Sequence, residues 1–291
     1  MKPGRCLILG SRGMLGRAWT GLLTAHEIPF DALGRDGLDL ENLDAVRSLD
    51  CSAYSHVINC AAWTAVDDAE AEYARAHAVN AEAVGVLAQQ CAQAGAQFVT
   101  YSTDYVFNGR ASEPYAVDGQ HDPVNAYGRS KAAGESLLQE IGGDWLCVRT
   151  SWVYAPWGKN FVKTIAGAAL ARPELKVVDD QRGRPTSAEG LARSSLGLMM
   201  AGVTGFAHAT DGGECSWFEF AQEIVRLVGL RAERLGQSVA AVVPCDSAEY
   251  PRPAARPAYS VLDLSQTEAV IGPMIPWQCA LADVMRRMDL G

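Results

Sequence analysis

Short apolar runs alternate with longer amphipathic segments along the first half of the chain. Strand-like runs and the helical stretches that follow them lie at 5–10 and 17–25, 56–59 and 69–94, 97–101 and 130–139, with a last run at 145–149. Short apolar runs bounded by turn residues are typical of buried strands. Their alternation with helices predicts an α/β fold, a Rossmann-type doubly wound parallel sheet.

The pattern changes after about Ser151. Loops rich in glycine, proline and aromatic residues lie at 152–160, 179–186 and 244–257, and helical periodicity lies at 161–171, 188–201 and 217–228. Prolines 251, 253 and 257 indicate an extended loop. We predict a dinucleotide-binding domain over 1–151, to which 179–215 and 258–275 return. A smaller C-terminal substrate-binding lobe is predicted over 152–178 and 216–257 plus 276–291.

Composition and charge narrow the classes of protein. With 48% hydrophobic and 20% charged residues over 291 positions, the chain can bury a large core. A net charge of −9 disfavours nucleic-acid binding, which needs a concentrated basic face. Apolar stretches such as 6–10 and 196–203 are too short to span a membrane, and the N-terminal segment does not resemble a secretory signal. We therefore expect a cytoplasmic protein that binds neither nucleic acid nor membrane.

The eight cysteines are scattered singly, without the paired spacing or the nearby histidines of a zinc site. Isolated cysteines in a reducing compartment usually act as small buried hydrophobic residues. We expect buried thiols and no bound metal.

A Gly-x-x-Gly-x-x-Gly loop follows the first predicted strand, with Gly10, Gly13 and Gly16 at its three positions. This junction is where the pyrophosphate of a dinucleotide meets a helix N-terminus. Gly10 permits a tight turn, Gly13 lets the backbone approach the phosphates, and Gly16 allows the helix to pack closely on the strand. Glycines that merely end a strand have the same appearance, so the loop needs supporting signals.

The second predicted strand ends near 30–33, and Gly34, Arg35 and Asp36 follow it where the adenosine ribose would lie. A carboxylate there favours NAD, whereas a guanidinium binds the 2′-phosphate of NADP through charge-assisted bonds. Arg35 points to NADPH, and a solvated surface arginine is the alternative interpretation.

Tyr127 and Lys131 form the strongest chemical signal, with Ser102, Thr103 and Asp104 at the end of an earlier strand. Positions i and i+4 share a helix face, so the Lys131 ammonium can lie beside the Tyr127 ring and a cofactor ribose. A free phenol has a pKa near 10, and a neighbouring cation that lowers it by roughly two to three units suits the phenol to proton transfer near neutrality.

Hydride transfer to a ketone builds negative charge on the carbonyl oxygen. Tyr127 would supply a proton to that oxygen, and Thr103 a second hydrogen bond. A Tyr-x-x-x-Lys pair alone is more often an exposed helix pair, but a glycine loop and a Ser-Thr step at a strand end favour a reductase site.

Segments along nearly the whole chain resemble the dTDP-4-dehydrorhamnose reductase family, within the extended or atypical short-chain dehydrogenase/reductase superfamily. They are 10–16, 59–67 (NCAAWTAVD), 102–107 (STDYVF), 123–131 (PVNAYGRSK) with Gly134 and Glu135, 149–154 (RTSWVY), 160–161, 180–181, Gly183, Pro185, Thr186 and 256–257. The resemblance implies NADPH- or NADH-dependent reduction of dTDP-4-dehydro-L-rhamnose (dTDP-4-dehydro-6-deoxy-L-mannose) to dTDP-L-rhamnose in nucleotide-sugar biosynthesis.

The resemblance also implies roles for single residues, with Thr103, Tyr127 and Lys131 catalytic. The cofactor would be held by Tyr127, Lys131, Gly10, Ser11, Arg12, Gly13, Met14, Leu15, Gly16, Arg35, Asp39, Leu40, Cys60, Ala61, Ala62, Thr64 and Tyr101. The nucleotide sugar would be held by Trp63, Val66, Thr103, Asp104, Tyr105, Trp152, Asn160 and Arg256. Arg256 is the candidate for the substrate phosphate, and an arginine paired with the acidic surface is the alternative.

In some members of the resembled family, acidic residues are expected to hold magnesium at a dimer interface. Here Met14 stands where one such carboxylate would be, although Glu189 matches another. We expect no metal-dependent dimer of this kind, but a monomer or weak homodimer.

Other functions remain open. A sugar-nucleotide dehydratase or epimerase would use the same fold and Tyr-Lys pair, but a dehydratase has an acid pair after the threonine, and here Tyr105 follows Asp104. A 4-ketoreductase of another nucleotide-linked deoxysugar fits the same residues. A noncatalytic regulatory subunit of the methionine adenosyltransferase type is the last alternative, and the intact Thr103, Tyr127 and Lys131 argue against it.

Overall fold

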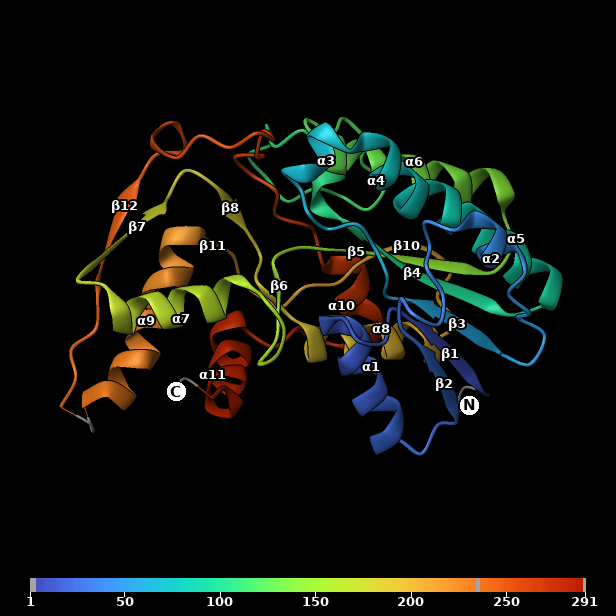
Figure 1. Cartoon of the computed structure of the whole chain (residues 1–291), viewed down its shortest axis with the longest axis horizontal. Helices are drawn as coiled ribbons and strands as arrows, with labels where there is room; N and C mark the ends of the chain where they lie inside the picture. The colour runs from blue at the N-terminus through green and yellow to red at the C-terminus, as the bar shows by residue number, and fades with distance from the viewer. Residues whose placement is uncertain (1–3, 234–235, 290–291) are drawn as a thin grey trace.

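A parallel sheet of six strands forms the centre of one half of the molecule (Figure 1). In spatial order the strands are β10 (Gly205–His208), β5 (Trp145–Thr150), β4 (Gln97–Thr103), β3 (His56–Asn59), β1 (Cys6–Leu9) and β2 (Phe30–Leu33). All neighbouring pairs are parallel. The predicted α/β class with a doubly wound parallel sheet is confirmed.

The computed structural model describes residues 4–233 and 236–289. The ends of the predicted ranges 1–151 and 276–291 therefore include positions, 1–3 and 290–291, that lie outside the described residues, as do 234–235 within 216–257. Among the described residues, no helix is both long and apolar enough to cross a membrane.

Helices cover both faces of the sheet. Successive side chains of a strand point to opposite faces, and in the central strands both sets are apolar. Leu7 and Leu9 face one apolar cluster, and Cys6 and Ile8 face another. The first face carries α2 (Leu43–Arg47), α5 (Ala83–Ala94) and α6 (Ala126–Ile141), with α3 (Asp68–Ala71) and α4 (Tyr73–His77) beside them. The second face carries α1 (Met14–Ala25), α8 (Ala188–Met200) and α10 (Ser265–Ile271).

A smaller lobe lies beside the sheet and has its own apolar cluster around Phe220. It contains α7 (Phe161–Ala171), α9 (Trp217–Ala232), α11 (Trp277–Arg287), η4 (Ser247–Glu249) and the strand pair β7 (Glu174–Val178) with β12 (Ala241–Cys245). Two short strand pairs connect this lobe to the segment 179–215: β8 (Arg182–Gly183) with β11 (Cys215–Ser216), and β6 (Val153–Tyr154) with β9 (Thr186–Ser187). The loop predicted over 244–257 begins later than expected, because Pro244 belongs to β12. In the part of the chain that the structure describes, that strand pairs with β7 alone, so the missing proline N–H does not interrupt a central ladder.

The prediction of a single helix over 69–94 is wrong. The chain turns at Glu72 (φ −117°, ψ 36°) between α3 and α4, and η1 (Ala78–Glu82) is a π-helical turn before α5. Asn80 in that turn accepts a hydrogen bond from the Trp63 amide at 2.9 Å and donates one to the Ser130 hydroxyl at 2.9 Å. These long-range bonds stabilise the wider turn. The apolar periodicity of the segment does not predict them, because their partners lie elsewhere in the chain.

Candidate active site

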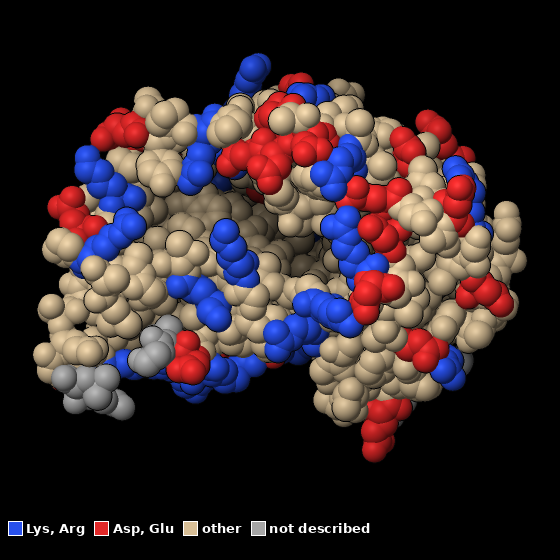
Figure 2. Space-filling model, viewed as in Figure 1, with Lys and Arg blue, Asp and Glu red and all other residues tan. Residues whose placement is uncertain are grey.

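A cavity of about 430 Å³ opens at the carboxyl ends of the strands, lined mainly by the sheet half, with Val153 of β6 on the side toward the lobe. This volume lies in the range of small-molecule and cofactor sites. Figure 2 shows the corresponding hollow between the two halves, bordered by Lys and Arg side chains. The position between β1 and β3, where the strand order reverses, is the usual ligand position in an open parallel sheet.

The glycine loop approaches the cavity with backbone rather than side chains. Gly10 adopts φ +71°, and a Cβ there would lie 2.7 Å from the amide nitrogen of Ala61. A Cβ on Gly16 would lie 2.3 Å from the carbonyl oxygen of Gly10. Helix α1 then begins after Gly13, and no described side chain caps its first-turn amides or adds an acidic group to them. This open, positive helix end fits the pyrophosphate of a dinucleotide.

Most of the cofactor residues expected from the sequence lie around this cavity. Ser11 and Gly16 do not line it, because Gly16 is buried against the loop backbone and supports the loop from behind. The other expected positions line it, and so do positions that were not expected as cofactor contacts: Gly34, Leu38, Glu41, Val79, Ser102, Thr150, Val153 and Leu191. Ser102 and Thr150 lie at the carboxyl ends of strands, a signal that was available in the sequence. Leu191 comes from α8, and local sequence patterns hold no signal for it.

Opposite charges surround the end of the cavity beyond β2. The Arg35 guanidinium donates to Asp39 at 3.2 Å and to Glu41 at 2.6 Å, and Arg75 also donates to Glu41 at 2.9 Å. Arg12 forms a separate pair with Asp36 at 2.9 Å. Arg35 therefore lies where an adenosine ribose would lie, but its charge is shared with two carboxylates.

Tyr127 and Lys131 lie on the same face of α6, which begins at Ala126. The Asn125 side chain accepts a hydrogen bond from the Gly128 amide at 2.7 Å and so caps the helix next to Tyr127. Lys131 Nζ donates to the carbonyl oxygen of Tyr101 on β4 at 2.7 Å. Both side chains line the cavity.

The pKa values of this pair differ from the expectation based on the sequence. Burial raises the pKa of Tyr127 above its ordinary range, and a hydrogen bond with Thr103 opposes this. Burial lowers the pKa of Lys131 to about 8. A lowered pKa of Tyr127 was expected from Lys131, but here desolvation outweighs the cation, whose ammonium is directed to the backbone of β4.

Thr103 and Asp104 follow at the end of β4. Thr103 Oγ1 accepts a hydrogen bond from the Tyr105 amide at 3.2 Å and donates one to Asp104 Oδ1 at 2.9 Å. Thr103 thereby caps the short turn η2 (Asp104–Val106). The two side chains are buried, 5% and 2% exposed, beside the Tyr127 phenol.

A buried ion pair that the sequence analysis did not identify ties α6 to β5. Arg149 donates to Glu135 at 2.7 Å, and the two side chains are 2% and 1% exposed. His121 lies 2.7 Å from the same carboxylate, and Arg149 also donates to the Val117 carbonyl at 2.7 Å. Burial alone would raise the pKa of Glu135, but hydrogen bonds from His121 and Arg149 with the arginine charge lower it to about 2. Glu135 is one turn beyond Lys131, so this pair holds in place the face of α6 that carries Tyr127 and Lys131.

Among the eight residues expected to contact the sugar, Trp63 alone lines the cavity in the part of the chain that the structure describes. Trp152 adopts φ +49° and stacks on Trp217 with ring centroids 3.6 Å apart. A Cβ on Gly183 would lie 2.7 Å from the Trp152 ring, so only glycine leaves room for this arrangement. Val66 and Tyr105 pack around Tyr127 in a small apolar cluster.

Two of the expected substrate residues form hydrogen bonds within the protein. Asn160 accepts from the Lys163 amide at 3.1 Å, capping α7, and donates to the Ala155 carbonyl at 2.9 Å. The Asn160 side chain thus stabilises the start of α7, because the first amides of a helix need an acceptor. Arg256 donates to Asp67 at 2.9 Å, which is the alternative kept open for it.

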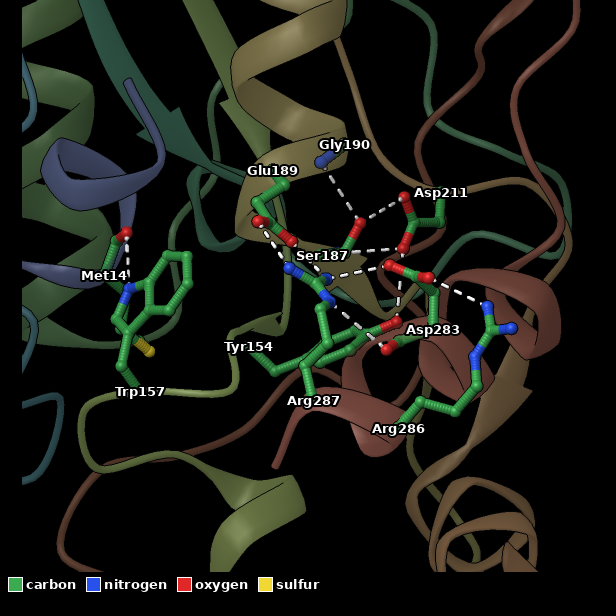
Figure 3. A network of polar contacts seen from close by, with 10 residues as sticks. All are labelled: Met14, Tyr154, Trp157, Ser187, Glu189, Gly190, Asp211, Asp283, Arg286 and Arg287. Atoms are coloured by element: carbon green, nitrogen blue, oxygen red, sulfur yellow. Dashed lines mark hydrogen bonds and ion pairs between the residues drawn. The ribbon is translucent and has the colours of Figure 1, made fainter. Parts of the chain in front are cut away.

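Glu189, the possible acidic counterpart of a metal ligand, is also paired. Figure 3 shows its carboxylate bound by both terminal nitrogens of Arg287 on α11, one of them at 2.7 Å. In the same view the Met14 carbonyl accepts a hydrogen bond from the Trp157 indole at 3.1 Å. Within 4–233 and 236–289, no three His, Cys, Asp or Glu side chains come together as a metal site. Met14 and Glu189 therefore join the two halves of the molecule through protein contacts.

Comparisons with known proteins agree with this arrangement. Residues 4–290 match the family model described as "RmlD substrate binding domain". The chain is 38% identical, over 97% of its length and 98% of the relative, to the dTDP-4-dehydrorhamnose reductase of Burkholderia thailandensis. It is 39% identical, over 96% and 94%, to a probable dTDP-4,6-dihydroxy-2-methyloxan-3-one 4-ketoreductase of Streptomyces antibioticus. Its structure is similar to that of Bacillus anthracis dTDP-4-dehydrorhamnose reductase in complex with NADP, with a TM-score of 0.90, 33% identity and coverage of 99% and 100%.

Proposed function

Because this chain belongs to the RmlD substrate binding domain family, which includes dTDP-4-dehydrorhamnose reductases, we propose that it reduces dTDP-4-dehydro-L-rhamnose to dTDP-L-rhamnose in nucleotide-sugar biosynthesis. It is an NAD(P)H-dependent oxidoreductase of the Rossmann type, as its family and its structural relatives imply. The family resemblance seen in the sequence is thereby confirmed.

The cradle of the glycine loop fits the cofactor, since its backbone and the open N-terminus of α1 suit a pyrophosphate. Gly10 and Gly13 would hold the phosphates of the cofactor, and Arg35 would contact its adenosine ribose. Ala61 and Ala62 would contact the cofactor from the cavity wall that follows β3. When bound, the reduced nicotinamide supplies the hydride that reduces the ketone.

The protein's own residues handle the proton and the developing charge. Tyr127 donates a proton to the substrate oxygen as negative charge grows there, and Thr103 stands beside it as a second hydrogen-bonding group. Lys131, held against the Tyr101 carbonyl, keeps a cation near the phenol and favours the phenolate that proton transfer leaves behind. Trp63, on the cavity wall, shapes the space next to the ketone.

The observation that carries the proposal is the convergence of Tyr127 and Lys131 from α6 with the glycine loop on one cavity. A ketone reductase needs its proton donor and its cofactor cradle in the same water-poor space. The six-residue stretch from Thr103 to Asn108 contributes only one carboxylate, Asp104, so it offers no acid pair for a dehydratase.

The test follows NADPH and NADH absorbance while the purified protein meets dTDP-4-dehydro-L-rhamnose generated in situ, with product identification by mass and NMR. We expect oxidation of the reduced cofactor and formation of dTDP-L-rhamnose, and loss of turnover by about 10²-fold or more in Tyr127→Phe. Absence of oxidation by a protein that still binds the cofactor would contradict the proposal.

A second candidate is a 4-ketoreductase of another nucleotide-linked deoxysugar. The 39% identity to a probable 4-ketoreductase of a different dTDP-linked sugar favours keeping this alternative. The same assay with a panel of dTDP-4-keto sugars separates the two, because the preferred substrate has the highest kcat/KM.

We further propose that residues up to 151, with 179–215 and 258–275, hold the cofactor, and that 152–178, 216–257 and 276–291 hold the sugar. The separate apolar cluster of the lobe supports this division. A monomer or weak homodimer is proposed because Arg287 already neutralises Glu189. The eight unpaired cysteines support a reducing compartment, the cytoplasm.

A further inference from the structure

Asp104 is a buried carboxyl group directly beside Thr103. Its side chain is 2% exposed, and Oδ1 accepts the Thr103 hydroxyl at 2.9 Å. Among the described residues, Oδ2 has no hydrogen-bond partner and the carboxyl has no ion-pair partner. An ionised carboxylate in such a place is costly, so the geometry favours a proton on Asp104.

The groups that face Asp104 come from three elements. Tyr105 on η2 and Tyr127 on α6 are the titratable ones, and the Ser260 hydroxyl comes from the segment after Arg256. The Arg256–Asp67 pair lies nearer to Tyr105 and balances its own charge. Burial raises the pKa of Asp104 to about 7, although the nearby Ser260 hydroxyl and the hydrogen bond from Thr103 oppose this rise.

Thr103 has a single hydroxyl proton, so it can donate only one hydrogen bond. When Asp104 is ionised, it accepts this proton, and Thr103 can only accept from other groups. When Asp104 is neutral, its own O–H can donate to Thr103 Oγ1 across the same 2.9 Å contact. The Thr103 proton is then available to the oxygen of a ketone bound beside Tyr127.

We propose that Asp104 is a positioning residue that acts through Thr103: its protonated form turns the Thr103 hydroxyl toward the substrate oxygen, and its ionised form withdraws that hydrogen bond. This inference rests on the proposed function and differs from the direct sugar contact that the family resemblance implies for Asp104. It places a proton-dependent switch one residue away from the reacting groups.

The first experiment titrates the carboxyl itself in the cofactor-free protein. Protein labelled with ¹³C at the aspartate carboxyls is followed by NMR from about pH 4 to about pH 9, and the Asp104 signal is identified by its absence in Asp104→Asn. The expected midpoint is near 7. A midpoint near the ordinary value of about 4 overturns the proposal, whatever the substrate proves to be.

The second experiment compares kcat over the same pH range with the dTDP-ketosugar. Wild type is expected to lose activity by about tenfold per pH unit above the midpoint, because the neutral fraction falls in that proportion. Asp104→Asn has an amide N–H that can donate to Thr103 at every pH, so this decline should be absent until Lys131 titrates near pH 8. Asp104→Ala leaves the Thr103 hydroxyl without a group that orients it, so it should be about tenfold slower than wild type below the midpoint and, like Asp104→Asn, should not decline near pH 7.

A combined variant separates positioning from folding. In Thr103→Val, the further change Asp104→Asn should leave the pH profile unaltered, because the path through the hydroxyl is gone. A decline near pH 7 that persists unchanged in Asp104→Asn contradicts the proposal. Failure of wild type to turn over any dTDP-ketosugar contradicts the proposed function instead, and the carboxyl titration still decides the state of Asp104.

Discussion

The Nζ atom of Lys131 lies 2.7 Å from the carbonyl oxygen of Tyr101, and this bond joins α6 to β4 inside the sheet half. The lysine is 6% exposed, and burial lowers its pKa to about 8. A buried cation held by one backbone acceptor is placed for chemistry at a cost in stability.

Lys131→Met should therefore reduce activity and stabilise the fold. We expect kcat to fall by roughly 10²-fold or more, because the Tyr127 phenolate loses its cation. The folded pKa of Lys131 is below its ordinary value of 10.5, so the unfolded chain binds more protons between about pH 8 and 10.5 and wild-type stability rises with pH in that window. Urea unfolding should show this rise in wild type and not in Lys131→Met, whose free energy of unfolding near pH 7 should be higher by about 1–3 kcal/mol. A Lys131→Met variant less stable than wild type would contradict the claim that the buried ammonium lowers the stability of the fold.

Gly16→Ala and Gly21→Ala form a matched pair on the same helix, α1. A Cβ on Gly16 would lie 2.3 Å from the Gly10 carbonyl oxygen, whereas a Cβ on Gly21 would meet nothing within 4 Å. We expect Gly16→Ala to weaken cofactor binding at least about tenfold through distortion of the glycine loop. Gly21→Ala should stabilise the protein by about 0.5–1 kcal/mol. Cofactor titration and urea unfolding measure the cofactor affinity and the free energy of unfolding of both variants. Equal cofactor affinities would contradict a role of the glycine loop in cofactor binding.

Arg35→Ala tests the 2′-phosphate site. The guanidinium borders the cavity between Asp39 and Glu41, and its loss leaves two carboxylates that repel a phosphate. KM for NADPH should rise about tenfold or more, while KM for NADH changes by less than about threefold. Arg47→Ala is the control, since that arginine is paired with Asp44 on the surface and does not line the cavity. Similar changes in KM for NADPH and NADH would show that Arg35 does not bind the 2′-phosphate and would favour its interpretation as a surface arginine.

His208 should contribute to acid sensitivity. Its Nδ1 lies 3.0 Å from the Asp263 carbonyl and its Nε2 lies 3.3 Å from Arg149, so the ring is neutral. Burial, with the Arg149 charge, lowers its pKa to about 4 from an ordinary 6.5. The unfolded chain therefore binds more protons between these values, and stability falls as the pH drops from 6.5 to 4.

The size of this effect is on the order of 3 kcal/mol. His208→Gln should be less stable near neutrality and should lack that part of the pH dependence, as urea unfolding at several pH values measures. Glu135, whose pKa is lowered to about 2, adds its own loss of stability only below about 4.5, so it does not affect the slope between about pH 5 and 6.5. An unchanged slope in the variant between pH 5 and 6.5 would show that His208 does not titrate there.

Trp217→Ala should weaken sugar binding indirectly. Trp217 stacks on Trp152 at 3.6 Å and holds it at φ +49°, a conformation that costs a bulky residue about 1–3 kcal/mol. Without the stack, Trp152 should relax, and KM for the dTDP-ketosugar should rise about tenfold with KM for the cofactor unchanged. Leu230→Ala, half exposed on the same helix, should change neither value. A rise of both KM values would indicate a general loss of structure.

Local patterns in the sequence were enough to predict the architecture. The alternation of Cys6 and Ile8 with Leu7 and Leu9 places apolar side chains on both faces of a strand, and helical periodicity marks the elements that cover them. The four-residue spacing of Tyr127 and Lys131 likewise places both on one helix face. These relations are carried by covalent geometry and short repeats, so they can be read without a structure.

Other relations depend on how distant elements pack. The Asn80 side chain widens a helix because Trp63 and Ser130 lie against it, and Arg256 pairs with Asp67, a residue far earlier in the chain. No repeat or spacing encodes such contacts, because they form only when segments far apart in the chain are brought together.

The sequence by itself determined the parallel sheet, the glycine loop after its first strand, and the placement of Tyr127 and Lys131 on one helix face. Each of these follows from patterns within a few neighbouring residues. The tertiary structure alone decided that Leu191 lines the cavity, that Arg149 neutralises Glu135, and that Asp104 is buried beside Thr103 with no ion-pair partner among the described residues. Burial and desolvation are properties of the packed whole, and they set the pKa values on which the proposed chemistry depends.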